Sequence, residues 1–327
     1  MKAYAVKQNI LQVREISDPV PQHDEVVVDI KIAGLNRRDL SIAAKAGDRE
    51  DALVLGSDGA GVISKVGENV QDVQIGDEVI INPSLRWNKN SDAPPEGFDI
   101  LGFPDNGTLA EKIVLHHDQV ESKPSNLSWE AAGVLALAAL TGYRALVTKG
   151  EVKAGQTVFI PGAGSGVATY MIQVAKSKGA KVIVSSRSES KREAALKIGA
   201  DVAIDTNSDW EKELADETID LIIDSVGAAT FNRSLDVLKK GGRIVIFGAT
   251  TDDVTDLDLR AFFYGQYQLL GSTMGSREEL HEVLKLIEDN QIKPVVSETY
   301  SLDKADEAFE YLKVNDQFGN IAIKVND

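Results

Sequence analysis

Three closely spaced glycines in the middle of the chain are the first residues whose pattern predicts chemistry. Residues 157–160 read as an apolar strand, and the segment after it contains Gly162, Gly164, Ser165, Gly166 and Val167. A pyrophosphate binds to backbone N–H groups at the start of a helix, and glycine lets the backbone come close to it. The spacing departs by one residue from G-x-G-x-x-G, so a glycine-rich loop without function is the alternative. Because the segment joins a predicted strand to a predicted helix, we expect it to bind a dinucleotide.

The end of the next predicted strand indicates which dinucleotide. An NAD site usually places a carboxylate there for the ribose 2′-hydroxyl. This chain has Ser185, Ser186 and Arg187 instead, with Lys191 four residues further on. An arginine can pair with a 2′-phosphate that a carboxylate would repel. We therefore expect NADP(H) as the cofactor, with Arg187 as an ordinary solvated surface residue as the alternative.

The elements that must position these residues alternate between strand and helix over residues 125–271. Apolar runs at 157–160, 181–185, 202–204, 221–224, 243–247 and 268–271 predict strands, and helical segments separate most of them. Apolar strands that alternate with helices form a parallel sheet covered on both faces. The expected fold class is α/β, with a Rossmann-type doubly wound sheet as the dinucleotide-binding domain.

The two flanking parts of the chain have a different pattern. Residues 1–124 contain short alternating runs bounded by turn residues, which predict an irregular, mostly β domain. Within it, residues 82–105 are rich in Pro, Asn, Asp and Gly and predict a long surface loop. Residues 272–327 contain two helical segments and a last strand, too little to fold alone. We expect them to return to the N-terminal domain.

Composition excludes several classes of partner. Lysine and arginine minus the acids give 35 − 51 = −16, so nucleic acid and anionic lipid are poor partners for this surface. The absence of cysteine excludes disulfides and thiolate sites. The first residues show no secretory pattern, and no apolar run is long enough to span a bilayer. We expect a cytoplasmic protein that acts on a small molecule.

Several short segments, taken in order, resemble the medium-chain dehydrogenase/reductase superfamily, and in particular its zinc-lacking, quinone-oxidoreductase-like branch. They are 33–39 (AGLNRRD), 56–63 (GSDGAGVI), 76–79 (GDEV), 106–111 (NGTLAE), 140–146 (LTGYRAL), 224–227 (DSVG), 240–249 (KGGRIVIFGA) and 270–273 (LGST). The resemblance covers nearly the whole chain. It implies that the mostly β domain is GroES-like.

The resemblance also bears on metal binding. Zinc-binding relatives have cysteine where Asn36 stands, histidine where Ser57 stands, and cysteine near Leu137. A tight zinc site needs three or four good ligands, so we expect no metal. His116 and His117 are adjacent on a predicted strand and are expected to point to opposite faces.

The resemblance implies further cofactor-binding residues near the nicotinamide. They are Thr141, Ser225, Val226, Phe247, Gly248, Ala249, Ser272, Thr273 and Met274. Arg37 stands where relatives sometimes supply a cation for the pyrophosphate, and a salt bridge with Asp39 is its alternative. Asn320 stands where related reductases often have a lysine near the cofactor.

The resemblance implies hydride transfer to a quinone or an α,β-unsaturated carbonyl, which builds negative charge on oxygen. Asn36 is the first candidate to stabilise that charge and Tyr143 the second, while capping and packing are their alternative roles. Asp39 and Asp58 are expected to support the site. A zinc-free alcohol dehydrogenase or aldehyde reductase, and a weakly catalytic NADPH-binding sensor or structural protein, are the alternative functions. Relatives pair along the edge strand at 268–271, so we expect a homodimer.

Overall fold

The computed structural model describes residues 1–326, and these form two compact units. The first unit contains Met1–Ala138 and Ser276–Asp327, and the second contains Ala139–Gly275. Residues 125–138, which we expected in the dinucleotide-binding domain, therefore belong to the first unit. The reason is that α2 (Trp129–Gly133) packs against β3 (Glu25–Leu35) and β5 (Asp58–Val66). Gly133 permits this contact, because a Cβ atom there would lie 2.5 Å from Ile32 Cγ2.

The second unit is built on a six-stranded sheet in which all strands are parallel, in the order β13-β12-β11-β14-β15-β16. The strands are β11 (Thr157–Pro161), β12 (Lys181–Ser186), β13 (Val202–Asp205), β14 (Ile219–Asp224), β15 (Leu238–Ile246) and β16 (Gln268–Gly271). The helical segments are α3 (Ala136–Tyr143, which crosses the boundary), η2 (Arg144–Lys149), α4 (Gly166–Ser177), α5 (Glu189–Lys197), α6 (Trp210–Glu213), α7 (Ala228–Val237) and α8 (Leu259–Gly265). The predicted doubly wound α/β sheet is confirmed.

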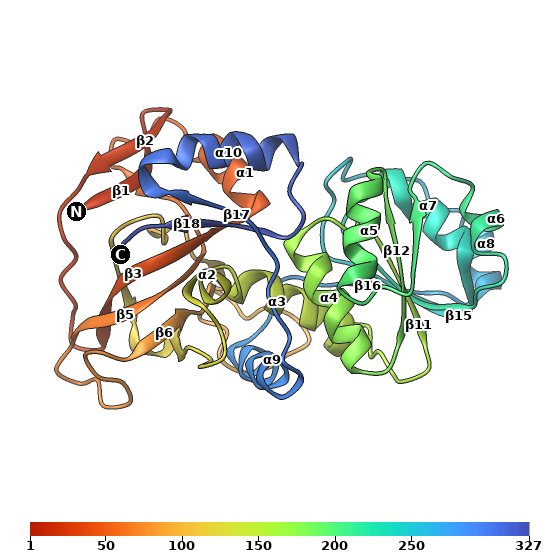
Figure 1. The fold of residues 1–327 in the computed structure, drawn as a ribbon, viewed down its shortest axis with the longest axis horizontal. Coiled ribbons are helices and arrows are strands. Elements are labelled where there is room, and N and C mark those ends of the chain that lie inside the picture. The colour runs from red at the N-terminus through yellow and green to blue at the C-terminus, as the bar shows by residue number, and fades with distance from the viewer. Residues whose placement is uncertain (327) are drawn as a thin grey trace. The chain divides into compact units, whose positions relative to one another are not determined.

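Apolar side chains on both faces of this sheet form the core of the second unit. All five residues of β11 are buried, as covering by helices on both faces requires. Figure 1 shows α4 and α5 on one face of the sheet and α7 on the other. Phe159 in β11 is fully buried and meets the Trp210 ring edge-on, with 5.0 Å between the ring centroids.

The first unit is mostly β. Its seven-stranded sheet has the order β10-β6-β5-β3-β18-β17, with β9 also paired to β3, and smaller sheets join β2-β1-β4 and β7-β8. The remaining strands are β1 (Lys2–Lys7), β2 (Ile10–Glu15), β4 (Leu53–Val54), β6 (Glu78–Ile81), β7 (Ser84–Leu85), β8 (Asp99–Ile100), β9 (Lys112–His116), β10 (Val120–Ser122), β17 (Val296–Ser301) and β18 (Asn320–Lys324). The remaining helical segments are α1 (Arg37–Ala46), η1 (His117–Gln119), α9 (Arg277–Asn290), η3 (Leu302–Lys304) and α10 (Ala305–Val314).

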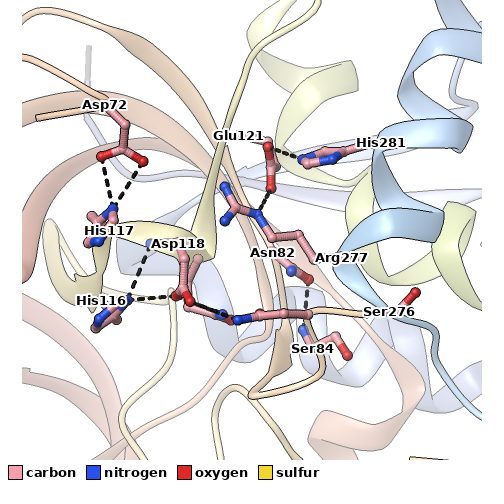
Figure 2. Close-up of polar contacts among 12 residues, drawn as sticks. Asp72, Asn82, Ser84, His116, His117, Asp118, Glu121, Ser276, Arg277 and His281 are labelled. Atoms are coloured by element: carbon pink, nitrogen blue, oxygen red, sulfur yellow. Dashed lines mark hydrogen bonds and ion pairs between the residues drawn. The ribbon is translucent and has the colours of Figure 1, made fainter. Parts of the chain in front are cut away.

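Residues 276–326 belong to the first unit, whereas residues 272–275, which we expected to join it as well, belong to the second. Strand β18 pairs antiparallel with β3 in the middle of the large sheet. Helix α9 is joined to β10 by Glu121, whose carboxylate contacts Arg277 Nε at 2.5 Å and His281 Nε2 at 2.7 Å (Figure 2). A single, largely buried carboxylate thus connects two segments that lie 156 residues apart in the chain.

Residues 82–105 are more than the surface loop that their composition predicts. They include the short strands β7 and β8, and Trp87 is only 1% exposed. The Trp87 ring packs edge-on against Phe98, with the ring centroids 5.3 Å apart. The polar composition predicted a surface loop, but the buried Trp87 holds this otherwise polar segment against the protein.

Among residues 1–326, no helix combines the length and the apolar character needed to cross a bilayer.

The core of the second unit yields a stability prediction. Phe159→Ala should lower the free energy of unfolding of this unit by about 3–5 kcal/mol, because it opens a cavity against Trp210. Trp210 is the single tryptophan of the second unit, so its fluorescence in a denaturant titration reports on this unit. The half-exposed Phe263 is the matched control, and Phe263→Ala should change stability by less than about 0.5 kcal/mol. Equal losses in the two variants would contradict this account of the core.

Candidate functional site

The glycine segment forms a tight turn between β11 and α4, as its sequence predicts. Gly162 has a φ of 86°, which favours glycine, and its N–H and that of Ala163 both donate to the carbonyl of Ser185. Ser165 caps α4 by accepting from Ala168 N at 3.1 Å. The N–H groups of Gly166 and Val167, in the first turn of α4, cannot reach a carbonyl within the helix. The turn therefore offers backbone donors and a positive helix end to an anion.

The end of β12 carries positive charge close to this turn. Arg187 is exposed and has no ion pair within the part of the chain that the structure describes. The side chain of Lys191 lies across Gly164, since a Cβ atom on that glycine would be 2.8 Å from Lys191 Cδ. Arg192, which sequence reasoning missed, donates to the carbonyl of Ser186 at 2.7 Å. Residues 185–188 contain no carboxylate.

The other predicted residues of the second unit follow the carboxyl ends of the remaining strands, because parallel strands end at one edge of a sheet. Ser225 and Val226 follow β14, residues 247–249 follow β15, and residues 272–274 follow β16. The hydroxyl of Ser272 is buried and has no hydrogen-bond partner in the described structure. An orphaned buried hydroxyl at this edge is suited to a ligand.

Two further residues of this edge lie close together. The Thr141 hydroxyl on α3 lies 3.6 Å from the sulfur of Met274, and both side chains are buried. Met274 has a φ of 42°, a backbone conformation that is strained for methionine. Tyr143, two residues after Thr141, is also buried, with 6% of its side chain exposed.

Asp224 holds the turn after β14 and was missed as a site residue, although its segment carried the family resemblance. Its carboxylate accepts from Val226 N at 2.6 Å, from Gly227 N at 3.2 Å and from the Thr230 hydroxyl at 2.7 Å. Burial raises the pKa of Asp224, and these hydrogen bonds oppose the rise. Asp224 is thus a positioning residue for Val226.

In the first unit, a buried carboxylate fixes Asn36. The Asn36 side-chain amide, at the start of α1, donates to Asp58 at 2.8 Å. The second oxygen of Asp58 accepts from Leu137 N at 2.7 Å. Asp58 is 1% exposed, and burial raises its pKa to about 7. Asp39 accepts from Asn36 N at 2.8 Å, and burial raises the pKa of Asp39 to about 6. Both acids support Asn36 structurally, as expected.

Arg38 lies in the same place and was not among the predicted site residues. Its Nη1 donates to the Ser57 hydroxyl at 2.5 Å and to the Leu101 carbonyl at 2.8 Å. Ser57 itself donates to the Leu101 carbonyl at 2.7 Å. Burial lowers the pKa of Arg38, and Asp39 and Asp58 oppose this effect. No sequence signal separated Arg38 from the neighbouring Arg37, which is exposed.

Another predicted residue of the first unit, Asn320, bonds to the backbone of Val295. It is 5% exposed, and its N–H donates to the Val295 carbonyl at 2.8 Å. Its side-chain amide contacts the same carbonyl at 3.4 Å. Asn320 and Val295 therefore hold the start of β18.

The prediction for the two adjacent histidines was wrong. Strand β9 ends at His116 and η1 begins at His117, so the rings do not alternate across a sheet but lie 4.7 Å apart. Each ring contacts its own carboxylate, His116 with Asp118 and His117 with Asp72 (Figure 2). A cavity of about 680 Å³ is lined in part by His116 and Asp118, and it includes none of the predicted site residues.

The comparisons with known proteins agree with this architecture. Residues 22–125 match the model of the alcohol dehydrogenase GroES-like domain, and residues 166–289 match that of the zinc-binding dehydrogenases. An acryloyl-coenzyme A reductase of Sulfurisphaera tokodaii is 31% identical over 329 residues, which cover 96% of this chain and 96% of that protein. The chain belongs to the medium-chain dehydrogenase/reductase superfamily. The predicted superfamily and the GroES-like nature of the first domain are confirmed.

Two solved structures of this superfamily extend the comparison. The crystal structure of an NAD-dependent alcohol dehydrogenase has a TM-score of 0.93 and 34% identity and covers 100% of both chains. The structure of the crotonyl-CoA carboxylase/reductase AntE in complex with NADP has a TM-score of 0.88 and 25% identity, over 99% of this chain and 94% of that chain. With such reductases and dehydrogenases as its relatives, the chain is an oxidoreductase.

The residues of the first unit do not fit the zinc ion that part of this superfamily binds. The resemblance places Asn36, Ser57 and Leu137 where zinc-binding relatives have ligands. In this structure these residues are engaged with Asp58, Arg38 and the Leu101 carbonyl. A guanidinium on Ser57 would repel a divalent cation. Residues 1–326 contain no group of three or more His, Asp or Glu side chains that could hold a metal.

The buried Asp58 yields a prediction for the dependence of stability on pH. Its pKa is raised in the folded state from an ordinary value of 3.8, so the folded protein holds the proton more tightly than the unfolded chain. The free energy of unfolding should therefore fall as the pH rises from about 4 to about 7, with a slope of up to about 1.4 kcal/mol per pH unit from this group.

Asp58→Asn should remove that slope, and denaturant titrations at several pH values measure it. Asp51→Asn, which changes an exposed carboxylate of the same unit, is the matched control and should keep the slope. If Asp58→Asn left the pH dependence as steep as in the wild type, the raised pKa would be refuted.

Proposed function

We propose that this chain is an NADPH-dependent, zinc-independent reductase that transfers hydride to a quinone or an α,β-unsaturated carbonyl. The observation that carries the choice of cofactor is the end of β12, where Ser185, Ser186 and Arg187 replace a carboxylate. The unpaired, exposed Arg187 supports it, because an arginine binds a phosphate through two parallel hydrogen bonds. The relationship to an acryloyl-CoA reductase supports a conjugated carbonyl as the substrate.

The residues fit a dinucleotide at the strand ends of the second unit. Gly162, Gly164, Ser165, Gly166 and Val167 would hold its pyrophosphate, and Ser186, Arg187 and Lys191 its 2′-phosphate. The nicotinamide portion would contact Thr141, Ser225, Val226, Phe247, Gly248, Ala249, Ser272, Thr273 and Met274. When bound, the cofactor supplies the hydride.

The first unit would contribute the groups that bind the reacting oxygen. Asn36 is oriented by Asp58 and has a second amide hydrogen to donate. We keep Arg37 as a contact for the pyrophosphate, and its exposed position supports this role. Tyr143 as a catalytic residue and Asn320 as a cofactor contact stay predictions, and Asn320 has less support because its amide is directed to Val295.

A zinc-independent alcohol dehydrogenase or aldehyde reductase is the second candidate, favoured by the similarity to an NAD-dependent alcohol dehydrogenase. It would use the same cofactor site. The two candidates differ in whether the hydride adds to the carbonyl carbon or to the carbon conjugated with it.

We also keep the predictions of a cytoplasmic protein and of a homodimer paired along β16. This strand is an edge of the six-stranded sheet and exposes Leu269, which supports pairing with a second copy. Light scattering on the purified protein would test the dimer, and a monomeric mass would refute it.

Steady-state oxidation of NADPH with a panel of quinones, enones and simple aldehydes tests the proposed activity. Turnover with but-3-en-2-one or a benzoquinone, well above that with butanal, is the expected result. Turnover with butanal and none with the enones or quinones would establish the second candidate instead. Absence of turnover with all of them would refute both.

The choice of NADPH predicts the effect of one substitution. Arg187→Ala should weaken NADPH binding about ten-fold or more, since it removes a charge-assisted contact with the 2′-phosphate, and should leave NADH binding unchanged. Calorimetric titration with each dinucleotide measures both affinities. Arg260→Ala, an exposed arginine on α8, is the matched control. Equal losses for the two dinucleotides would remove the reason for choosing NADPH.

A further inference from the structure

Arg38 is unusual among the charged side chains of the first unit. It is partly buried, and burial lowers its pKa, yet no carboxylate lies within 4.0 Å of its guanidinium in residues 1–326. Its hydrogen bonds in the described structure both come from Nη1, so Nε and Nη2 have no partner there. Neither nitrogen is among the fully buried unpartnered atoms of the described structure, so both are accessible to a ligand.

The fold does not need Arg38 to satisfy its neighbours. The Leu101 carbonyl, which Arg38 contacts, already accepts from the Ser57 hydroxyl at 2.7 Å. In that same hydrogen bond the Ser57 hydroxyl is the donor, so its own hydrogen has a partner. Removing the guanidinium therefore leaves no buried donor or acceptor of this pair without a partner, and a purely structural role does not account for the residue.

Arg38 and the predicted oxygen-binding residue Asn36 bond to neighbouring positions of the chain. Arg38 is attached to Ser57, and Asn36 is attached to the next residue, Asp58. Asn36 and Arg38, at the start of α1, thus bond to the consecutive residues Asp58 and Ser57, where β5 begins. Together they present N–H groups and one positive charge, while the acids that face them, Asp39 and Asp58, are occupied by Asn36 and Leu137.

From this geometry, and on the basis of the proposed function, we infer that Arg38 binds the carbonyl oxygen of an α,β-unsaturated carbonyl substrate. The guanidinium supplies the positive charge that a metal ion supplies in zinc-dependent members of the superfamily. When bound, the reduced nicotinamide would supply a hydride to the β carbon, and the electron pair of the C=C bond would move so that an enolate formed. The enolate oxygen carries the negative charge against Arg38 and Asn36, and the α carbon then takes a proton from water. The products would be the saturated carbonyl, the oxidised nicotinamide and the hydroxide that is left when water gives up its proton.

Substitution kinetics test this role. Arg38→Gln should lower kcat for but-3-en-2-one about one hundred-fold to one thousand-fold, the effect of removing a donor to a developing oxyanion. The melting temperature should not fall, because an unpaired, partly buried charge is removed. Arg38→Lys, which keeps the charge without the planar fork, should retain part of kcat. Lys45→Gln removes an exposed cation from the same helix and should change neither quantity.

A binding measurement without turnover provides the second readout. 4-Nitrophenol carries its charge on oxygen when ionised, and the absorption of the phenolate reports its ionisation. Bound to the wild type, it should ionise about one pH unit or more below the free compound, because an adjacent cation favours the charged form. Arg38→Gln should lose this shift, and Lys45→Gln should keep it.

The outcomes separate this inference from the proposed function. If Arg38→Gln kept kcat within about three-fold, or if the wild type did not lower the pKa of the phenol, the role of Arg38 would be refuted. If the wild type oxidised no NADPH with any enone, the proposed function would fall, while the phenol titration would still decide whether Arg38 binds an anionic oxygen. If Arg38→Gln did not fold, Arg38→Lys would be the test. A kcat of Arg38→Lys equal to that of the wild type would refute a role for the planar guanidinium in binding the carbonyl oxygen.

Discussion

A charged group that leaves water must find partners inside the protein, and this constraint organises both units. The buried Asp224 carboxylate accepts hydrogen bonds from backbone N–H groups and a hydroxyl, and these bonds shape the turn after β14. Asp58 meets the same constraint with the Asn36 amide and Leu137 N, and it thereby joins β5 to the starts of α1 and α3. Arg38, which is only partly buried, bonds through Nη1 to Ser57 and the Leu101 carbonyl and leaves its other nitrogens accessible.

The second unit shows how topology gathers residues that are distant in the chain. Its strands are all parallel, so the segments after β11, β12, β14, β15 and β16 share one edge of the sheet. The carbonyl of Ser185 connects two of them directly, because it accepts from Gly162 N and Ala163 N. The position of the glycine turn and the position of the positive charge after β12 are therefore coupled through one backbone group.

Much of this arrangement could be predicted from the sequence, where local pattern decides the structure. The strand–turn–helix around Gly162 and the missing carboxylate after β12 are both visible in a few consecutive residues. The failures concern contacts between distant segments. The boundary moved to Ala138 because α2 packs on β3, and Trp87 is buried inside a segment of polar composition. Arg38 was missed for the same reason, since adjacent arginines differ only in where their side chains point.

The hydrogen bonds of Asp58 also limit which single substitutions the start of β5 can accept. A zinc site requires three or four correct ligands at once. Here Asn36 and Leu137 N both depend on the Asp58 carboxylate, and Ser57 is already joined to a cation. Replacing any one of these positions alone disturbs a buried network without creating a metal site. A change that introduced metal ligands at these positions would therefore require several substitutions at once, and replacing Asn36 or Ser57 alone breaks a hydrogen bond that now holds that residue.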